Sequence, residues 1–152
     1  MELISSKTLS RLAAIQSSFQ TFFDNQSIDN IANQFNKYRY NKLLDTNNIK
    51  LKYNKNYYDK LILFIENFDS KHDVNIFFSE YVKSKRPYKR LDTIIKAILI
   101  VGTSEILNND TLKKSIIIND YIIISKFFLE KSEVSLINAI LDKIYDTRNK
   151  YK

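Results

Sequence analysis

The chain has 152 residues, a net charge of +7 and a pI near 9.4, and it contains one glycine, one proline and no cysteine. The scarcity of glycine and proline argues against an architecture of many strands and tight turns, and the lack of cysteine excludes disulfides and thiolate metal sites. We therefore predict an all-α fold, with residues 1–152 forming one domain that is large enough to bury its own core.

The positive charge permits binding to a polyanion but does not demand it. Isoleucine, asparagine, lysine, tyrosine and phenylalanine are all abundant, as in proteins from AT-rich genomes, so coding bias accounts for part of the lysine content. The N-terminus lacks the pattern of a signal peptide, and no apolar run reaches the 18 residues of a membrane span. A cytoplasmic location is expected.

Apolar side chains recur with a helical period in four segments of the first half of the chain. The first covers residues 3–23 and ends with Phe22 and Phe23; the second runs from Ile28 to about Leu44 and includes Tyr38. Residues 45–56 are polar and predict a long connection. The third and fourth helices are expected at residues 57–68 and 74–82.

Three more helices are predicted in the second half. Pro87 suits the first turn of the fifth helix, whose core-facing side chains run from Leu91 to Ile106. Asp110 or Thr111 is expected to cap the sixth helix. The seventh helix is expected to begin with Ser132 as its cap, and its buried stripe contains Val134, Ile137, Leu141 and Ile144.

The last two helical patterns contain Ile118-Asn119-Asp120, Ser125-Lys126-Phe127 and the run from Asn138 to Lys143. Their order and spacing resemble the end of the NusB family of transcription antitermination proteins. Near the start, residues 13–20 (AAIQSSFQ) are similar to the family phrase AVQALYQ. The resemblance implies about seven helices, with a three-helix N-terminal part packed on a four-helix C-terminal part. It also implies close helix approach at Gly102, where the family usually has a small residue.

By this resemblance, the expected function is binding of boxA-type single-stranded RNA in ribosomal RNA leaders, together with the ribosomal protein NusE. Other Nus factors and RNA polymerase would join indirectly. Lys7 and Arg11 match basic positions of the family and, four residues apart, should share a helix face that holds phosphates. The neighbouring positions Ser5, Ser6, Thr8 and Ser10 offer hydroxyl donors but no charge, so less counterion release is expected.

A second basic cluster follows the fourth helix, where Tyr88 is available for base stacking. Its predicted RNA-binding residues are Lys85, Arg86, Lys89 and Arg90. An exposed loop without function explains this cluster equally well. A third mixture of basic and aromatic residues, between Lys37 and Lys55, is attributed to compositional bias.

Ile100 stands where the family's fifth helix has an arginine, and this loss motivates an alternative. The chain would then be a protein–protein interaction module with weak or lost RNA binding. Asn119, Asp120 and Asn138 are interpreted as structural polar groups between helices. His72 is the only histidine, so no metal site, cofactor or catalytic activity is predicted.

Overall fold

The computed structural model describes residues 5–40, 52–83 and 86–152, and within these ranges it contains seven α-helices and no strand. The α-helices are α1 (Ser6–Thr21), α2 (Ile28–Gln34), α3 (Lys55–Lys71), α4 (Val74–Ser79), α5 (Thr93–Asn108), α6 (Lys114–Ser125) and α7 (Lys131–Thr147). Short turns of other helix types follow α2 (Phe35–Arg39), precede α5 (Tyr88–Arg90) and follow α7 (Arg148–Tyr151). The predicted all-α class is confirmed.

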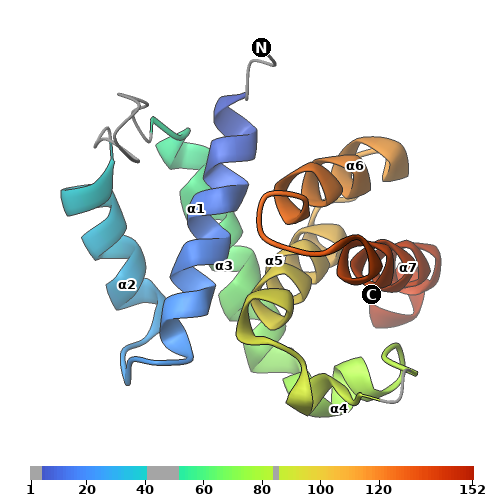
Figure 1. The fold of residues 1–152 in the computed structure, drawn as a ribbon. Helices are drawn as coiled ribbons and strands as arrows, with labels where there is room; N and C mark the ends of the chain where they lie inside the picture. The colour runs from blue at the N-terminus through green and yellow to red at the C-terminus, as the bar shows by residue number, and fades with distance from the viewer. Residues whose placement is uncertain (1–4, 41–51, 84–85) are drawn as a thin grey trace.

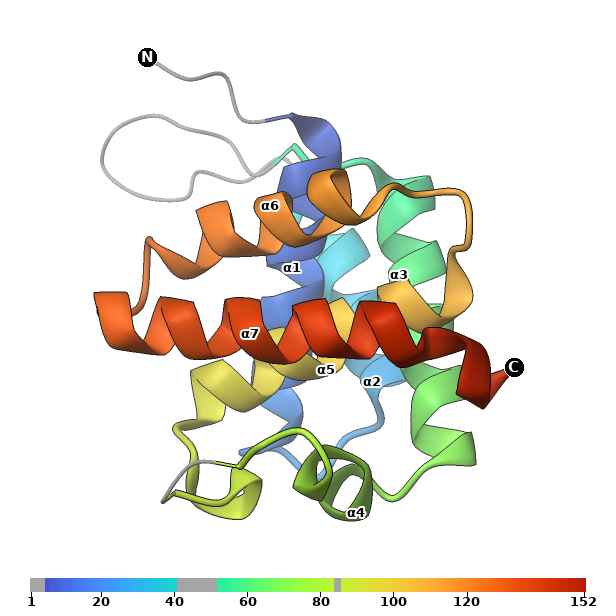
Figure 2. The ribbon, with the colours of Figure 1, turned by 90° about the vertical axis from the view of Figure 1, so that its right-hand side faces the viewer.

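Helix α5 is central, because it contacts α1 and α3 on one side and α6 and α7 on the other. Figure 1 shows α1, α2 and α3 side by side, and Figure 2 shows α6 and α7 running next to each other across α5. The three N-terminal helices therefore pack on the C-terminal four mainly through α1, α3 and α5. This is the arrangement that the resemblance implied.

The sequence of α5 explains its position. It is apolar on almost every side, and all its residues from Ala97 to Ile106 are buried. Its glycine makes the packing against α7 tight: a Cβ at Gly102 would lie 3.1 Å from both Cδ atoms of Leu141. The predicted close approach of two helices at Gly102 is thus confirmed.

Two predicted helix caps are wrong. Helix α6 starts after Lys113, without a side-chain cap, so neither Asp110 nor Thr111 caps it. The N-cap of helix α7 is Glu130, two residues before the predicted Ser132. The Glu133 carboxylate accepts the Glu130 N–H at 3.0 Å. This reciprocal pairing of N-cap and third helical residue is a capping box, which satisfies N–H groups that the first turn leaves unpaired.

Several predicted boundaries and faces also differ. Helix α2 gives way to a π-helical turn at Phe35, which leaves Tyr38 60% exposed instead of in the core. Residues 41–51, which include Leu44 and most of the predicted connection, lie outside the described residues. Pro87 precedes a separate 3-10 turn, and α5 starts only after Asp92. Phe22 and Phe23 follow the last turn of α1 and are exposed.

Candidate nucleic-acid interface

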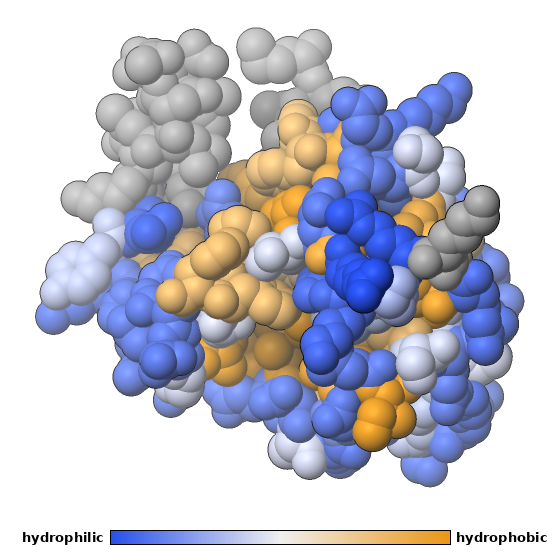
Figure 3. All heavy atoms as spheres, turned by 60° about the horizontal axis from the view of Figure 1, so that its bottom comes forward, coloured by the Kyte–Doolittle hydropathy of each residue, from blue (hydrophilic) through white to orange (hydrophobic). Residues whose placement is uncertain are grey.

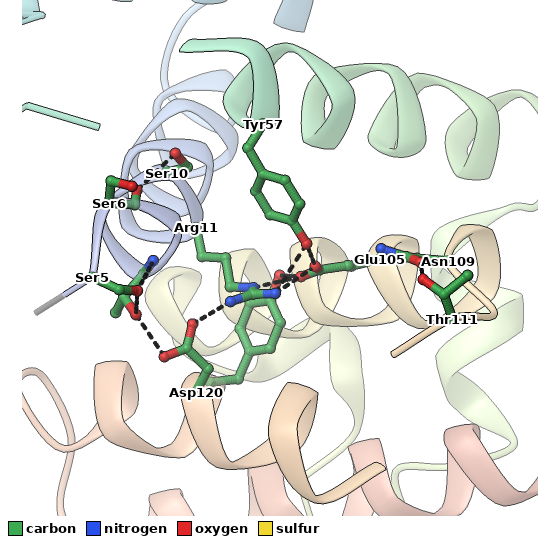
Figure 4. A network of polar contacts seen from close by, with 11 residues as sticks. Ser5, Ser6, Ser10, Arg11, Tyr57, Glu105, Asn109, Thr111 and Asp120 are labelled. Carbon is green, nitrogen blue, oxygen red and sulfur yellow. Dashed lines mark hydrogen bonds and ion pairs between the residues drawn. The ribbon is translucent and has the colours of Figure 1, made fainter. Parts of the chain in front are cut away.

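An ion-pair network connects four helices below the N-terminal end of α1. The Arg11 guanidinium donates from Nε and Nη2 to the two carboxylate oxygens of Glu105, both at 2.8 Å, and from Nη1 to Asp120 at 2.6 Å. The Tyr57 and Tyr121 hydroxyls also donate to Glu105. In Figure 4 the Arg11 side chain extends from α1 between Tyr57 of α3 and Asp120 of α6, toward Glu105 of α5.

The location of Arg11 overturns its predicted role on an exposed face. Its exposed fraction is 4%, and that of Glu105 is 0%. Burial by itself would lower the pKa of the Arg11 guanidinium, but the hydrogen bond to Glu105 and the nearby charge raise it above its ordinary value. Arg11 therefore stays charged, and its donors are already used by two carboxylates. Unlike Lys7, it presents almost no surface to solvent.

The hydroxyl groups predicted to face phosphates are partly used inside the protein as well. Thr8 Oγ1 donates to Asp120 at 2.8 Å, and Ser5 caps α1 by accepting the Thr8 N–H. Ser10, which is fully buried, donates to the backbone carbonyls of Ser6 and Asn54. These contacts attach α1 to α6 and to the start of α3, so Thr8 and Ser10 are structural residues.

Lys7 remains exposed, with its ammonium 5.2 Å from the centre of the Tyr57 ring. It lines two grooves. The first is lined by Lys7, Asn54, Asn56, Tyr57, Lys60, Asn109, Thr111 and Leu112. The second is lined by Ser5, Lys7, Thr8, Arg11, Leu112, Ser115, Ile116, Asn119 and Asp120.

The chain's tertiary contacts bring these groove residues together from four segments, and no local spacing in the sequence reveals them. Asn119 belongs to this surface and is exposed, as is Asn138 on α7, so their predicted place between helices is wrong. For Asp120 it is confirmed, since its carboxylate connects α6 to α1 through Thr8 and Arg11.

The second basic cluster lies elsewhere. Arg86, Lys89 and Arg90 are exposed, and Arg86 forms an ion pair with Asp92 at 3.4 Å. Lys85 lies outside the described residues. Tyr88 is buried and stacks on Phe78, with ring centres 4.6 Å apart, so the expectation that it stacks on RNA bases is wrong.

The two basic clusters do not converge. Lys7 is in the first turn of α1. The second cluster lies near the other end of this helix, because Lys96 contacts both: its Nζ donates to the Lys89 carbonyl at 2.6 Å and lies over the ring of Phe22. From residue 7 to residue 22, the helix rises by roughly 22 Å. Figures 1 and 2 likewise show the start of α1 at the top and the 3-10 turn before α5 at the bottom.

Exposed aromatic side chains lie at the ends of α1 and α6, although the sequence pattern placed Phe22 and Phe23 on the apolar face of the first helix. Phe22 and Phe23 are 41% and 71% exposed, and Phe127 and Phe128, which follow α6, are 66% and 47% exposed. Figure 3, in which the bottom of the Figure 1 view comes forward, shows apolar surface beside strongly hydrophilic side chains. Such exposed aromatics are typical of surfaces that contact a partner.

Within the described ranges, no three or more His, Asp or Glu side chains are grouped so that they could bind a metal ion. None of the helices described here combines the length and the apolar character that crossing a membrane requires.

The sequence profile of the NusB family matches residues 8–146. The chain belongs to the NusB family. Two proteins named transcription antitermination protein NusB are similar to it over nearly their whole length. That of Sinorhizobium medicae is 26% identical over 144 residues, which cover 95% of this chain and 88% of the relative. That of Rickettsia bellii is 28% identical over 144 residues, covering 93% and 90%.

A solved structure of NusB from T. maritima has the same fold, with a TM-score of 0.71 and 21% sequence identity. The match covers 96% of this chain and 93% of the T. maritima chain. The all-helical NusB fold thus extends over the whole seven-helix arrangement, including α2 and α3, where the sequence showed only helical periodicity.

Proposed function

We propose that the protein acts in transcription antitermination by binding boxA-type single-stranded RNA of ribosomal RNA leaders together with NusE, in the cytoplasm. Membership in the NusB family is the observation that carries this proposal, and relatives named transcription antitermination protein NusB align over about nine-tenths of the chain. Contact with other Nus factors and RNA polymerase would be indirect.

The exposed residues at the start of α1 give the proposal a physical mechanism. Lys7 and Lys60 can neutralise phosphates, and the amides of Asn54, Asn56 and Asn109 can bond to bases or sugars. Because these amides carry no charge, they release no counterions, and the salt dependence of affinity should be shallow. RNA binding by the protein alone is therefore proposed to be weak and to be strengthened by NusE.

Arg11 has a positioning role in this proposal. Its ion pairs with Glu105 and Asp120 fix the first turns of α1 against α5 and α6, and they lie directly beneath the groove beside Lys7. Arg86, Lys89 and Arg90, with Lys85, are proposed as a separate phosphate-binding patch. Since this patch is at the other end of α1, it would contact a different part of the RNA.

The exposed phenylalanines favour a second candidate, a protein-interaction module that no longer reads RNA. Phe22 and Phe23 follow α1, and Phe127 and Phe128 follow α6, so both pairs are held at helix ends and are not part of the core. Aromatic side chains contribute strongly to protein interfaces. In this case NusE or another protein would bind while RNA would not.

Fluorescence anisotropy with a boxA-like RNA strand and a scrambled strand tests both candidates. Each strand is titrated with the full chain, with and without NusE, at two salt concentrations. We expect tighter binding of the boxA strand when NusE is present, weakened by higher salt. Equal and feeble binding of both strands, beside a stable complex with NusE, would favour the protein-interaction module.

A further inference from the structure

A surface of basic and aromatic side chains lies where α2 ends and α3 begins. It is formed by the π-helical turn Phe35–Arg39, by Tyr40 and by the start of α3, and we call it the π-turn surface. Coding bias explains why such residues are abundant in this chain, but not why the fold gathers them in one place. The exposed residues of the π-turn surface are Lys37, Tyr38, Arg39, Lys52 and Lys55.

The turn is anchored to α3 by two consecutive side chains. Phe35 is 1% exposed, and its ring stacks on that of Tyr58, with ring centres 6.0 Å apart. Asn36 accepts a hydrogen bond from the Tyr53 hydroxyl and donates one to the Asp59 carboxylate, both at 2.9 Å. The next three side chains of the turn are exposed. The π-turn surface is therefore preformed, as is common for π-helical turns at functional sites.

The charge of this surface is positive. The described residues between 35 and 60 include five lysines and arginines and one acid, Asp59, whereas the whole chain has 24 basic and 17 acidic residues. Among the described residues, no carboxylate forms an ion pair with the exposed cations of the π-turn surface. These cations can therefore bind phosphates and release counterions, which the amide-lined groove beside Lys7 does only weakly.

Aromatic rings accompany these cations. The Lys55 ammonium lies 4.0 Å from the centre of the Tyr40 ring, and the Lys37 ammonium lies 5.2 Å from that of Tyr38. Tyr38 is nevertheless 60% exposed. An exposed ring beside a cation suits single-stranded RNA, because a base stacks on the ring while the cation holds a neighbouring phosphate. An acidic protein would use the cations but would leave the ring without a role.

The π-turn surface is continuous with the groove beside Lys7. Lys55 directly follows Asn54, which lines that groove. The Asn54 N–H donates to the Ser6 carbonyl at 3.3 Å and so joins the start of α3 to the start of α1. In Figure 1 the end of α2 and the starts of α1 and α3 all lie in the upper part of the view. An RNA strand bound beside Lys7 can therefore continue past Lys55 to Tyr38.

We propose that the π-turn surface binds nucleotides that flank boxA in the same RNA strand. One base stacks on Tyr38, and phosphates are held by Lys37, Arg39 and Lys55. This inference rests on the proposed function, because the groove beside Lys7 brings the strand to this surface. Stacking and phosphate contacts do not distinguish the bases, so the π-turn surface adds affinity without sequence preference.

Fluorescence anisotropy with RNA strands of different length tests this inference. One strand contains boxA alone, and two others carry about six additional uridines at the 5′ or the 3′ end. All are titrated in the presence of NusE. We expect one extension to tighten binding about fivefold or more, and Tyr38→Ala to remove that gain without changing affinity for the short strand. Tyr38→Phe keeps the ring and should keep the gain.

Failure of this inference and failure of the proposed function give different results. If the short strand binds but neither extension adds affinity, or if Tyr38→Ala retains the gain, the π-turn surface does not bind RNA and only this inference is wrong. If no strand binds in the presence of NusE, both are wrong. If Tyr38→Ala instead weakens the complex with NusE, the surface contacts protein, which also overturns the inference.

Tryptophan fluorescence gives a direct readout of stacking, because the chain contains no tryptophan. The extended strand is added to the chain alone at low salt, at concentrations where anisotropy shows the strand bound. We expect it to quench the emission of Tyr38→Trp. Ile76→Trp is the matched control, since Ile76 is 69% exposed and lies on α4, at the bottom of Figure 1. Equal quenching of the two variants, or none, would contradict base stacking at Tyr38.

Discussion

Arg11 of α1 and Glu105 of α5 are joined by two parallel hydrogen bonds of 2.8 Å in the interior of the protein. The two residues are 94 positions apart in the chain, and neither has more than 4% of its surface exposed. A bidentate pair of this kind fixes both distance and orientation. It therefore determines how the helix that carries Lys7 sits on the rest of the fold.

We predict that Arg11→Ala destabilises the protein by about 3–5 kcal/mol, because it leaves the Glu105 carboxylate buried without its cation. Urea unfolding followed by circular dichroism measures this. Lys7→Ala is the matched control, since it removes the same charge from an exposed position four residues earlier. If both variants unfold at the same urea concentration, the network does not stabilise the fold.

Two tyrosine hydroxyls in the core should behave in opposite ways. The Tyr57 hydroxyl bonds to both Arg11 and Glu105, so Tyr57→Phe should cost about 1–3 kcal/mol. The Tyr88 hydroxyl is buried without a partner, so Tyr88→Phe should be neutral or stabilise by up to about 1 kcal/mol. Thermal unfolding of the two variants compares them, and a larger loss for Tyr88→Phe would contradict the assigned contacts.

The contact between α5 and α7 at Gly102 gives a third prediction. A valine there adds atoms where even a Cβ would be 3.1 Å from Leu141, so Gly102→Val should cost about 1–3 kcal/mol. The penalty should shrink when Leu141→Ala makes room. A double-mutant cycle measures this coupling; purely additive free energies would show that the two side chains do not compete for space.

The start of α7 allows a direct comparison between the predicted cap and the observed one. Glu133→Ala should destabilise the protein by about 0.5–2 kcal/mol, because it removes the carboxylate that accepts the Glu130 N–H at the start of the helix. Ser132→Ala, at an exposed position inside the helix, should change stability by less than about 0.5 kcal/mol. Chemical denaturation measures both losses of stability. A larger loss for Ser132→Ala would indicate that Ser132 is the cap.

Lys7 is predicted to contact phosphate, in line with the proposed RNA binding. Lys7→Ala should lower affinity for boxA-like RNA in the presence of NusE and should reduce the slope of log K against log salt by about 0.7. Stability should stay unchanged, because the side chain is exposed. Lys143→Ala, which removes a lysine from an exposed position on α7, is the control and should leave the slope as it is.

Hydrophobic periodicity predicted the helices well where the periodic apolar side chains themselves form the buried face. The buried stripe of α7, with Val134, Ile137 and Leu141, follows from helical periodicity alone. Where a helix ends depends on weaker and competing contacts. Phe22 and Phe23 continue the periodicity of α1, yet they lie beyond its last turn and are exposed.

The sequence by itself determined the helical class and the family, because composition, periodicity and motif order do not depend on distant contacts. Only the tertiary structure decided what its charged and polar groups do. Arg11 and Lys7 are adjacent on a helical projection, but Arg11 meets Glu105 and Asp120 from far along the chain, while Lys7 meets solvent. Burial and partners, which arise only on folding, separate a structural charge from one that can bind RNA.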